Sequence, residues 1–185
     1  MGKKISVDSA TLVNKVFEIL ECYRLFDIPK SKFKIIIHPQ SFVHSIVFLK
    51  SGISFALMHK PDMKIPISIL LGINNFPKKK FFSVNDKFLP NTLEFKEVDK
   101  KRFPIVSILS HFRKKTSLFE SSFVSANDTL VDQFLKKKIS FNEISKNLLK
   151  LLKKKEFNYF KKVAPRDTNH IKEVQKLTML KTING

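Results

Sequence analysis

The segment SVDSATLVNKVFEILECY, residues 6–23, decides the expected fold at the start of this 185-residue chain. Apolar side chains recur in it with the three- and four-residue spacing of one helix face, at positions 12, 13, 16, 17, 20 and 23. Asp8 and Ser9 stand just before that pattern, and both residue types favour the N-cap of a helix. The pattern therefore predicts one amphipathic helix that begins at Asp8-Ser9 and ends before Pro29.

Four polar residues of this segment are candidates for a binding site. Ser9 is expected at the helix N-terminus, where free backbone N–H groups favour an anionic group. Asn14 and Lys15 lie four and three residues before Glu18, so these three side chains share one helix face. Hydroxyl, amide, ammonium and carboxylate groups together suit a phosphorylated polyol and one divalent ion. Spacing alone favours a simpler interpretation, a capped amphipathic helix with a Lys–Glu pair on its surface.

The net charge of +19 admits two interpretations. Binding to nucleic acid would use basic side chains to neutralise phosphates. Compositional drift in an AT-rich genome is favoured instead, because 31 of the 35 basic residues are Lys, which like Phe and Ile has codons of A and T alone. Nucleic-acid sites usually favour Arg for its bidentate contacts. The lysine runs at 78–80, 136–138 and 153–155 are also scattered along the chain.

The rest of the composition is that of a globular protein. Hydrophobic residues make up 43% of the chain, which is enough for a core, and the single Cys22 excludes an internal disulfide framework. No apolar run has the roughly 18 to 20 residues of a membrane span. The polar residues after the first methionine are unlike a signal peptide. We therefore expect a cytoplasmic protein without a membrane partner.

After the first helix, the spacing of apolar residues is first that of strands and later that of helices. A strand is expected at 33–37, a hairpin at 42–49 and 53–58 around Gly52, and a helix whose first turn contains Pro66. Residues 73–98 break every period and predict a linker. Helices are expected at 104–112, 121–137, 140–155 and from Asp167 or Thr168 onward. Ser140 and Glu143 form a capping box at the start of the third of these helices. The expected fold is an α/β portion with a small sheet at 1–72, then a four-helix bundle at 99–185.

Generic catalytic motifs are missing from the sequence. The four glycines, at 2, 52, 72 and 185, cannot form a Gly-x-Gly-x-x-Gly or Walker loop, and no Cys/His group has zinc spacing. Two further polar groups remain. Ser41 and His44 are candidates to line a pocket, although histidines near strands are more often structural. Met63 is a candidate to contact a planar cofactor, although Met more often fills a gap in a core.

Taken together, four blocks resemble 1-deoxy-D-xylulose 5-phosphate reductoisomerase. The block MGKKISVDSAT at 1–11, followed by Asn14-Lys15 and Glu18, resembles the family's substrate-binding signature. HPQS at 38–41 with HS at 44–45, and PDM at 61–63 with PI at 66–67, resemble the next two blocks in the same order. RFP at 102–104 and SAND at 125–128 give a weaker match to its C-terminal helical domain. The resemblance reaches about residue 145.

The resemblance implies a role for each matching position. The phosphorylated sugar substrate would be bound by Ser9, Asn14, Lys15 and Glu18. Glu18 would also ligate Mg²⁺ or Mn²⁺. NADPH would be contacted at Gly2 and Met63, with Met1 near the nicotinamide, and Ser41 and His44 would be pocket residues. The implied reaction is the rearrangement of 1-deoxy-D-xylulose 5-phosphate and its reduction by NADPH to 2-C-methyl-D-erythritol 4-phosphate, in bacterial non-mevalonate isoprenoid biosynthesis.

The resemblance also implies an incomplete enzyme. The family's Rossmann-like NADPH domain and two further metal-ligating carboxylates would precede this chain, and one carboxylate cannot by itself form a tight Mg²⁺ site. Val16 stands where the family has Gly, and Asp128 where it has Glu. We therefore expect the chain alone to be inactive, as a truncated gene model, the product of a split gene, or a product that works with a separately encoded N-terminal half. The full enzyme is expected to be a homodimer. The alternatives are an inactive folded remnant and, less favoured, a basic nucleic-acid-binding module.

Overall fold

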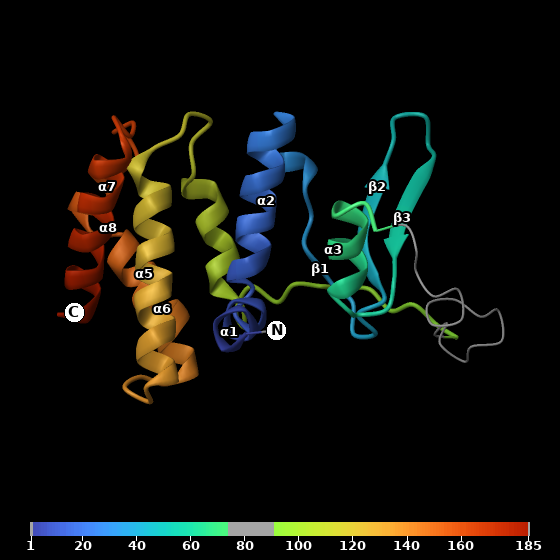
Figure 1. Cartoon of the computed structure of the whole chain (residues 1–185), viewed down its shortest axis with the longest axis horizontal. Helices are drawn as coiled ribbons and strands as arrows, with labels where there is room; N and C mark the ends of the chain where they lie inside the picture. Colours follow the sequence, from blue (N-terminus) through green and yellow to red (C-terminus); the bar gives the residue numbers. More distant parts are fainter. Residues whose placement is uncertain (1, 74–90, 185) are drawn as a thin grey trace. The chain divides into compact units, whose positions relative to one another are not determined.

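The computed structural model describes residues 2–73 and 91–184, which fall into two compact units (Figure 1). The first unit joins residues 1–34 to residues 99–185, and the second comprises residues 35–98. The described part of the chain is mostly helical, with two small two-stranded sheets. None of its helices is long and apolar enough to cross a bilayer.

The first unit begins with two helices, not with the single helix that the periodicity predicts. α1 spans Lys3–Ala10 and α2 spans Val13–Phe26. Between them Leu12 has a φ of 64°, in the left-handed region that disfavours a residue with a side chain. The Leu12 side chain is buried, and this burial offsets the backbone strain. The predicted N-cap at Asp8-Ser9 is therefore wrong, because both residues lie in the last turn of α1.

The rest of the first unit is also helical. Its remaining elements are η1 Lys30–Lys32, η2 Pro104–His111, α5 Leu118–Leu135, α6 Phe141–Leu152, α7 Lys155–Phe160 and α8 Thr168–Ile183. α5 packs against α1, α6, α7 and α8. The large side chains that are fully buried in this unit include Phe119, Phe123, Ile144, Leu148 and Phe157. α5 is thus the central helix of the core.

Local capping signals set the starts of the later helices. Ser140 and Glu143 form the predicted capping box, with the Ser140 N–H donating to Glu143 Oε2 over 2.7 Å. Asp167 caps α8 as expected, accepting from the His170 N–H at 2.8 Å. α5 begins earlier than the predicted 121–137, at a capping box of Ser117 with a glutamate three residues on. The sequence does not predict α7, and residues 104–111 form a 3-10 helix in place of an α-helix.

The second unit contains both sheets. β2 (Val43–Phe48) and β3 (Ser54–Met58) pair antiparallel around Gly52, whose φ is 87°, so the predicted hairpin is confirmed. β1 (Ile36–Ile37) is shorter than the predicted strand and pairs antiparallel with β4 (Lys96–Glu97), which lies in the predicted linker. α3 spans Lys64–Leu70 and has Pro66 in its first turn. Residues 74–90 of the predicted linker lie outside the described residues.

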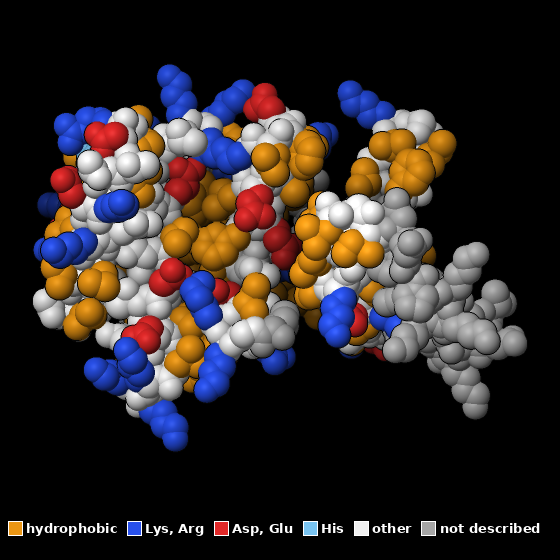
Figure 2. Space-filling view, viewed as in Figure 1, with side chains coloured by type: hydrophobic (Ala, Val, Ile, Leu, Met, Phe, Trp, Pro, Cys, Tyr) orange, Lys and Arg blue, Asp and Glu red, His pale blue; other side chains and the backbone are white. Residues whose placement is uncertain are grey.

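The expectation of helices with a small sheet is confirmed at this coarse level. The four-helix bundle and the domain boundaries at 72 and 98 stay predictions. Lysine and arginine side chains are distributed over the visible face of the helical unit and are not gathered into one stripe (Figure 2). That distribution agrees with the scattered lysine runs of the sequence.

Candidate functional site

Asn14, Lys15 and Glu18 form a polar cluster on the first turns of α2. Lys15 Nζ lies 2.9 Å from Glu18 Oε1 and 2.7 Å from Oε2, and Asn14 Nδ2 donates to Oε1 over 3.4 Å. The Lys15 and Glu18 side chains are 45% and 46% exposed, so both charged groups remain accessible to a ligand. The spacing prediction that these three residues share one face is confirmed. We call this group the α2 cluster.

The corner between α1 and α2 fixes where the α2 cluster begins. Thr11 is buried, and its hydroxyl donates to the carbonyl oxygens of Val7, at 3.1 Å, and Asp8, at 3.2 Å. The left-handed backbone at Leu12 then redirects the chain, and α2 starts at the next residue. Ser9 lies before this corner, half-buried in α1. Within the described residues its side chain makes no hydrogen bond to the α2 cluster, so three of the four predicted substrate residues are bonded to one another in the structure.

A second polar group, which sequence reasoning missed, holds α1 against α5. Asp8 is only 3% exposed and accepts hydrogen bonds from Lys4 Nζ and from Asn127 Nδ2, each at 2.8 Å. Lys4 also pairs with Asp128 at 2.9 Å. Burial lowers the pKa of Lys4, but the hydrogen bonds and charges of Asp8 and Asp128 outweigh it, and the pKa is raised overall. The SAND block at 125–128 was the available signal for this α1–α5 clamp.

The α2 helix is anchored at its other end by Arg24. The guanidinium pairs with Glu120 on α5 and donates to the backbone carbonyls of Lys114 and Arg113. The guanidinium has five N–H donors in one plane and can bond to several acceptors at once, whereas a lysine ammonium offers three donors around a single nitrogen. The C-terminal end of α2 is therefore held to the rest of the helical unit by polar contacts.

Three of the remaining predicted site residues, Ser41, His44 and Met63, lie in the second unit. The rings of His44 and His59 stack at 3.6 Å between centroids, and His44 Nε2 lies 3.1 Å from the His59 carbonyl oxygen. Ser41 is exposed and has a φ of 51°. Met63 is 56% exposed at the start of α3, so it does not fill a core gap in this chain. An exposed apolar side chain there is available for contact with another group.

The described residues supply only part of a metal site. No group of three or more His, Cys, Asp or Glu side chains within residues 2–73 and 91–184 could hold an ion together. Glu18 offers one carboxylate, whose oxygens are bonded to Lys15 and Asn14. A divalent ion such as Mg²⁺ requires about six oxygen ligands. The residues present therefore fit one ligand of such a site and not the complete site.

Gly2 precedes α1 as its N-cap residue. A Cβ atom at this position would meet nothing within 4 Å in the structure. The chain's own packing therefore does not require a glycine there.

The helical unit carries an Asn-Lys-Glu face on its second helix, and the other unit contains a strand hairpin. Two family models match the chain: "DXP reductoisomerase C-terminal domain" over residues 58–179, and "1-deoxy-D-xylulose 5-phosphate reductoisomerase C-terminal domain" over residues 1–26. The chain belongs to the 1-deoxy-D-xylulose 5-phosphate reductoisomerase family and corresponds to its C-terminal region.

Curated relatives and solved structures agree with that assignment. The Pelagibacter ubique enzyme is 43% identical over 181 residues, which cover 98% of this chain and 46% of the relative. The Wolbachia enzyme from Brugia malayi is 42% identical over 148 residues, 79% of this chain and 37% of the relative. The Zymomonas mobilis enzyme in complex with NADPH has a TM-score of 0.80 at 29% identity, covering 97% of this chain and 46% of that one. A reductoisomerase structure with NADPH, fosmidomycin and magnesium has a TM-score of 0.88 at 28% identity, covering 100% and 46%. This chain thus spans less than half the length of these relatives.

Proposed function

We propose that this chain is the C-terminal portion of an enzyme that converts 1-deoxy-D-xylulose 5-phosphate to 2-C-methyl-D-erythritol 4-phosphate with NADPH, in non-mevalonate isoprenoid biosynthesis. The observation that carries the proposal is the α2 cluster, an accessible ammonium, amide and carboxylate held together on one helix face. The family resemblance over 98% of the chain supports the reaction. The solved relative with NADPH, fosmidomycin and magnesium supports the cofactors.

The α2 cluster would bind and orient the phosphorylated substrate. Lys15 Nζ and Asn14 Nδ2 are donors, and in the free chain both point at the Glu18 carboxylate. A substrate that brings anionic and hydroxyl oxygens would take over these donors and leave the carboxylate available to a cation. Ser9, half-buried at the end of α1, would contribute a hydroxyl to the same substrate. A divalent ion held by Glu18 and by ligands from the rest of the enzyme would supply Lewis-acid polarisation of the substrate's ketone.

The family resemblance supports roles for the other predicted residues as well. Ser41 and His44 would be pocket residues of the enzyme, and His44 is held in place by its contact with the His59 carbonyl. Met63, with its exposed thioether side chain, would lie near the nicotinamide of NADPH, as would Met1, which lies outside the described residues. Gly2 would allow the cofactor to approach the backbone closely.

The proposal includes further polypeptide that this chain does not provide. The remaining metal ligands and the NADPH domain would come from the family's N-terminal half, and the chain alone would be inactive. We also propose that residues 99–185 form a four-helix bundle, which the buried face of α5 supports. A homodimer through the catalytic sheet is supported by the exposed apolar side chains of Val47, Phe55 and Leu57 on one face of the hairpin.

A chimera tests the proposal directly. The N-terminal remainder of the Pelagibacter ubique relative, joined to this chain, is expected to oxidise NADPH only when both 1-deoxy-D-xylulose 5-phosphate and Mg²⁺ are present. The 185-residue chain alone is expected to give no oxidation. In the chimera, Glu18→Gln keeps the shape of the side chain and removes the charge, and kcat is expected to fall at least about 100-fold.

Glu21→Gln is the matched control, because Glu21 is an exposed carboxylate on the same helix, three residues further along. It is expected to leave kcat within about twofold. A chimera that binds NADPH but never oxidises it with substrate would contradict the proposed activity and support the inactive remnant. Equal losses in Glu18→Gln and Glu21→Gln would contradict the role assigned to Glu18.

A further inference from the structure

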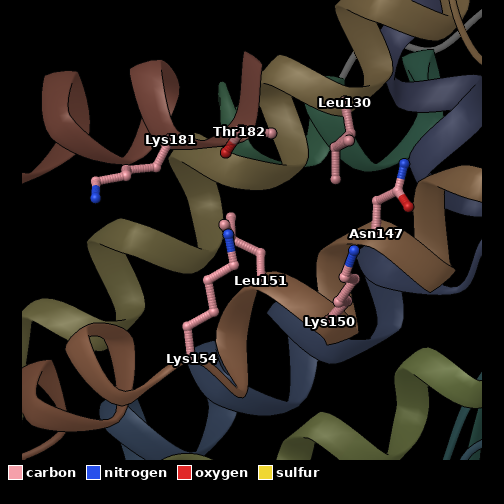
Figure 3. Close-up of a pocket in the computed structure, with 7 residues that line it drawn as sticks. All are labelled: Leu130, Asn147, Lys150, Leu151, Lys154, Lys181 and Thr182. Carbon is pink, nitrogen blue, oxygen red and sulfur yellow. The ribbon is translucent and has the colours of Figure 1, made fainter. Parts of the chain in front are cut away.

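A basic pocket lies among the C-terminal helices of the helical unit and shares no residue with the α2 cluster. It has a volume of about 100 Å³. Figure 3 shows the side chains that line it: Leu130, Asn147, Lys150, Leu151, Lys154, Lys181 and Thr182. These residues come from α5, α6 and α8 and from the residue that precedes α7. Three of the seven are lysines, although the lysines of the chain are otherwise scattered.

The lysines of this pocket differ in their partners. Lys181 lies 3.3 Å from Glu156, and in Figure 3 its chain extends away from the other lining residues. The ammonium ends of Lys150 and Lys154 are directed toward the space that the pocket encloses (Figure 3). In the described part of the chain, neither of these two ammonium groups pairs with a carboxylate. Two positive charges therefore face one concavity without compensation.

The floor of the pocket strengthens its attraction for an anion. Leu130 and Leu151 are buried, 1% and 5% exposed, and they place an apolar surface beneath the charges. Charge–charge attraction is stronger beside such a low-dielectric surface than in open water. The Asn147 amide can add a neutral donor. Thr182 adds none, because its hydroxyl donates to the Thr178 carbonyl at 2.7 Å.

The volume sets the size of the ligand. A water molecule occupies about 30 Å³ in the liquid, so the pocket accommodates a group of a few heavy atoms. We propose that it binds a phosphate group, either as inorganic phosphate or as the phosphomonoester of a small metabolite. The proposal is independent of the proposed reductoisomerase activity, because it uses none of the residues assigned to that reaction.

The test is a titration of the purified 185-residue chain, followed by the shifts of backbone amide signals in NMR spectra. Inorganic phosphate and glycerol 3-phosphate are titrated separately, at constant ionic strength against chloride. Saturable shifts are expected for amides in 147–154 and 181–182. Tighter binding of glycerol 3-phosphate would identify the phosphomonoester, and tighter binding of phosphate the free anion. Shifts that are linear in concentration, or equal for chloride, would overturn the proposal.

Four variants locate the binding. Lys154→Gln removes one inward ammonium and is expected to weaken the affinity about tenfold, as is Lys150→Gln. Lys155→Gln makes the same change in net charge at the next residue, which is exposed and outside the pocket, and should leave the affinity unchanged. Lys15→Gln should also leave the shifts at 147–154 unchanged. Equal weakening by Lys154→Gln and Lys155→Gln would show attraction by the overall charge alone and would refute the pocket.

Discussion

The α1–α5 clamp makes a quantitative prediction about Asp8. The Asp8 carboxylate is nearly inaccessible to solvent, and it accepts from Lys4 and from Asn127, which is fully buried. Asp8→Ala removes both contacts without removing either donor. The side-chain oxygen of Asn127, Oδ1, has no hydrogen-bond partner, so after the substitution the whole buried side-chain amide would be unpaired.

The expected loss of stability follows from these two donors. Leaving the buried Asn127 amide N–H groups without a partner costs about 1–3 kcal/mol. Lys4 is half exposed and keeps its contact with Asp128, so its share is at most about 1 kcal/mol. The free energy of unfolding is therefore expected to fall by about 1–4 kcal/mol. The double variant Asp8→Ala/Asn127→Ala should lose less than the sum of the two single variants, because each single change already breaks the shared contact.

Urea unfolding of the 185-residue chain, followed by far-ultraviolet circular dichroism, measures these differences. Asp132→Ala is the matched control, because Asp132 pairs with Lys136 on the exposed surface of α5. It should change the free energy of unfolding by less than about 0.5 kcal/mol. If Asp8→Ala and Asp132→Ala cost the same, or if the double variant is strictly additive, the clamp does not hold α1 to α5.

Two further predictions concern helix ends. Hydrogen bonds from the backbone N–H and, to a smaller extent, from the hydroxyl of Ser140 hold the pKa of Glu143 below its ordinary value of 4.5. The Glu143 carboxylate therefore stabilises the fold above pH 4.5, and this stabilisation is lost as the pH falls through the pKa of the folded state. The drop in Tm between about pH 6 and about pH 3 should therefore be smaller in Glu143→Gln than in the parent chain, and equal drops would contradict the capping role. Arg24→Lys should lower the free energy of unfolding by about 1–2 kcal/mol in urea titrations, because lysine cannot reach Glu120 and the carbonyls together. The same change at exposed Arg166 should cost under about 0.5 kcal/mol, and a similar loss at both positions would refute the anchoring of α2.

Features that depend on near neighbours in the sequence were predictable. The Ser140–Glu143 capping box, the Asp167 cap and the hairpin around Gly52 each involve residues within a few positions of one another. The shared face of Asn14, Lys15 and Glu18 follows from helical spacing in the same way. These features were predictable because a hydrogen bond between near neighbours needs little from the rest of the fold.

The corner at Leu12 was not predictable by such arguments. The apolar periodicity runs through it, and neither glycine nor proline marks it. A leucine in left-handed backbone costs roughly 1–2 kcal/mol, and an isolated segment would continue the helix. Burial of the Leu12 side chain offsets that cost, and burial depends on elements far along the chain. The same holds for β4, which pairs with β1 across about 60 residues of sequence.

The sequence by itself determined the family, the helical character of the C-terminal region, and the three side chains that meet on α2. Only the tertiary structure decided that Asp8 is a buried acceptor and not a helix cap, and that Ser9 ends one helix instead of starting another. Asp8 receives hydrogen bonds from residues four and 119 positions away. Spacing along a chain specifies the first contact, but packing between helices must specify the second, because no local period joins α1 to α5.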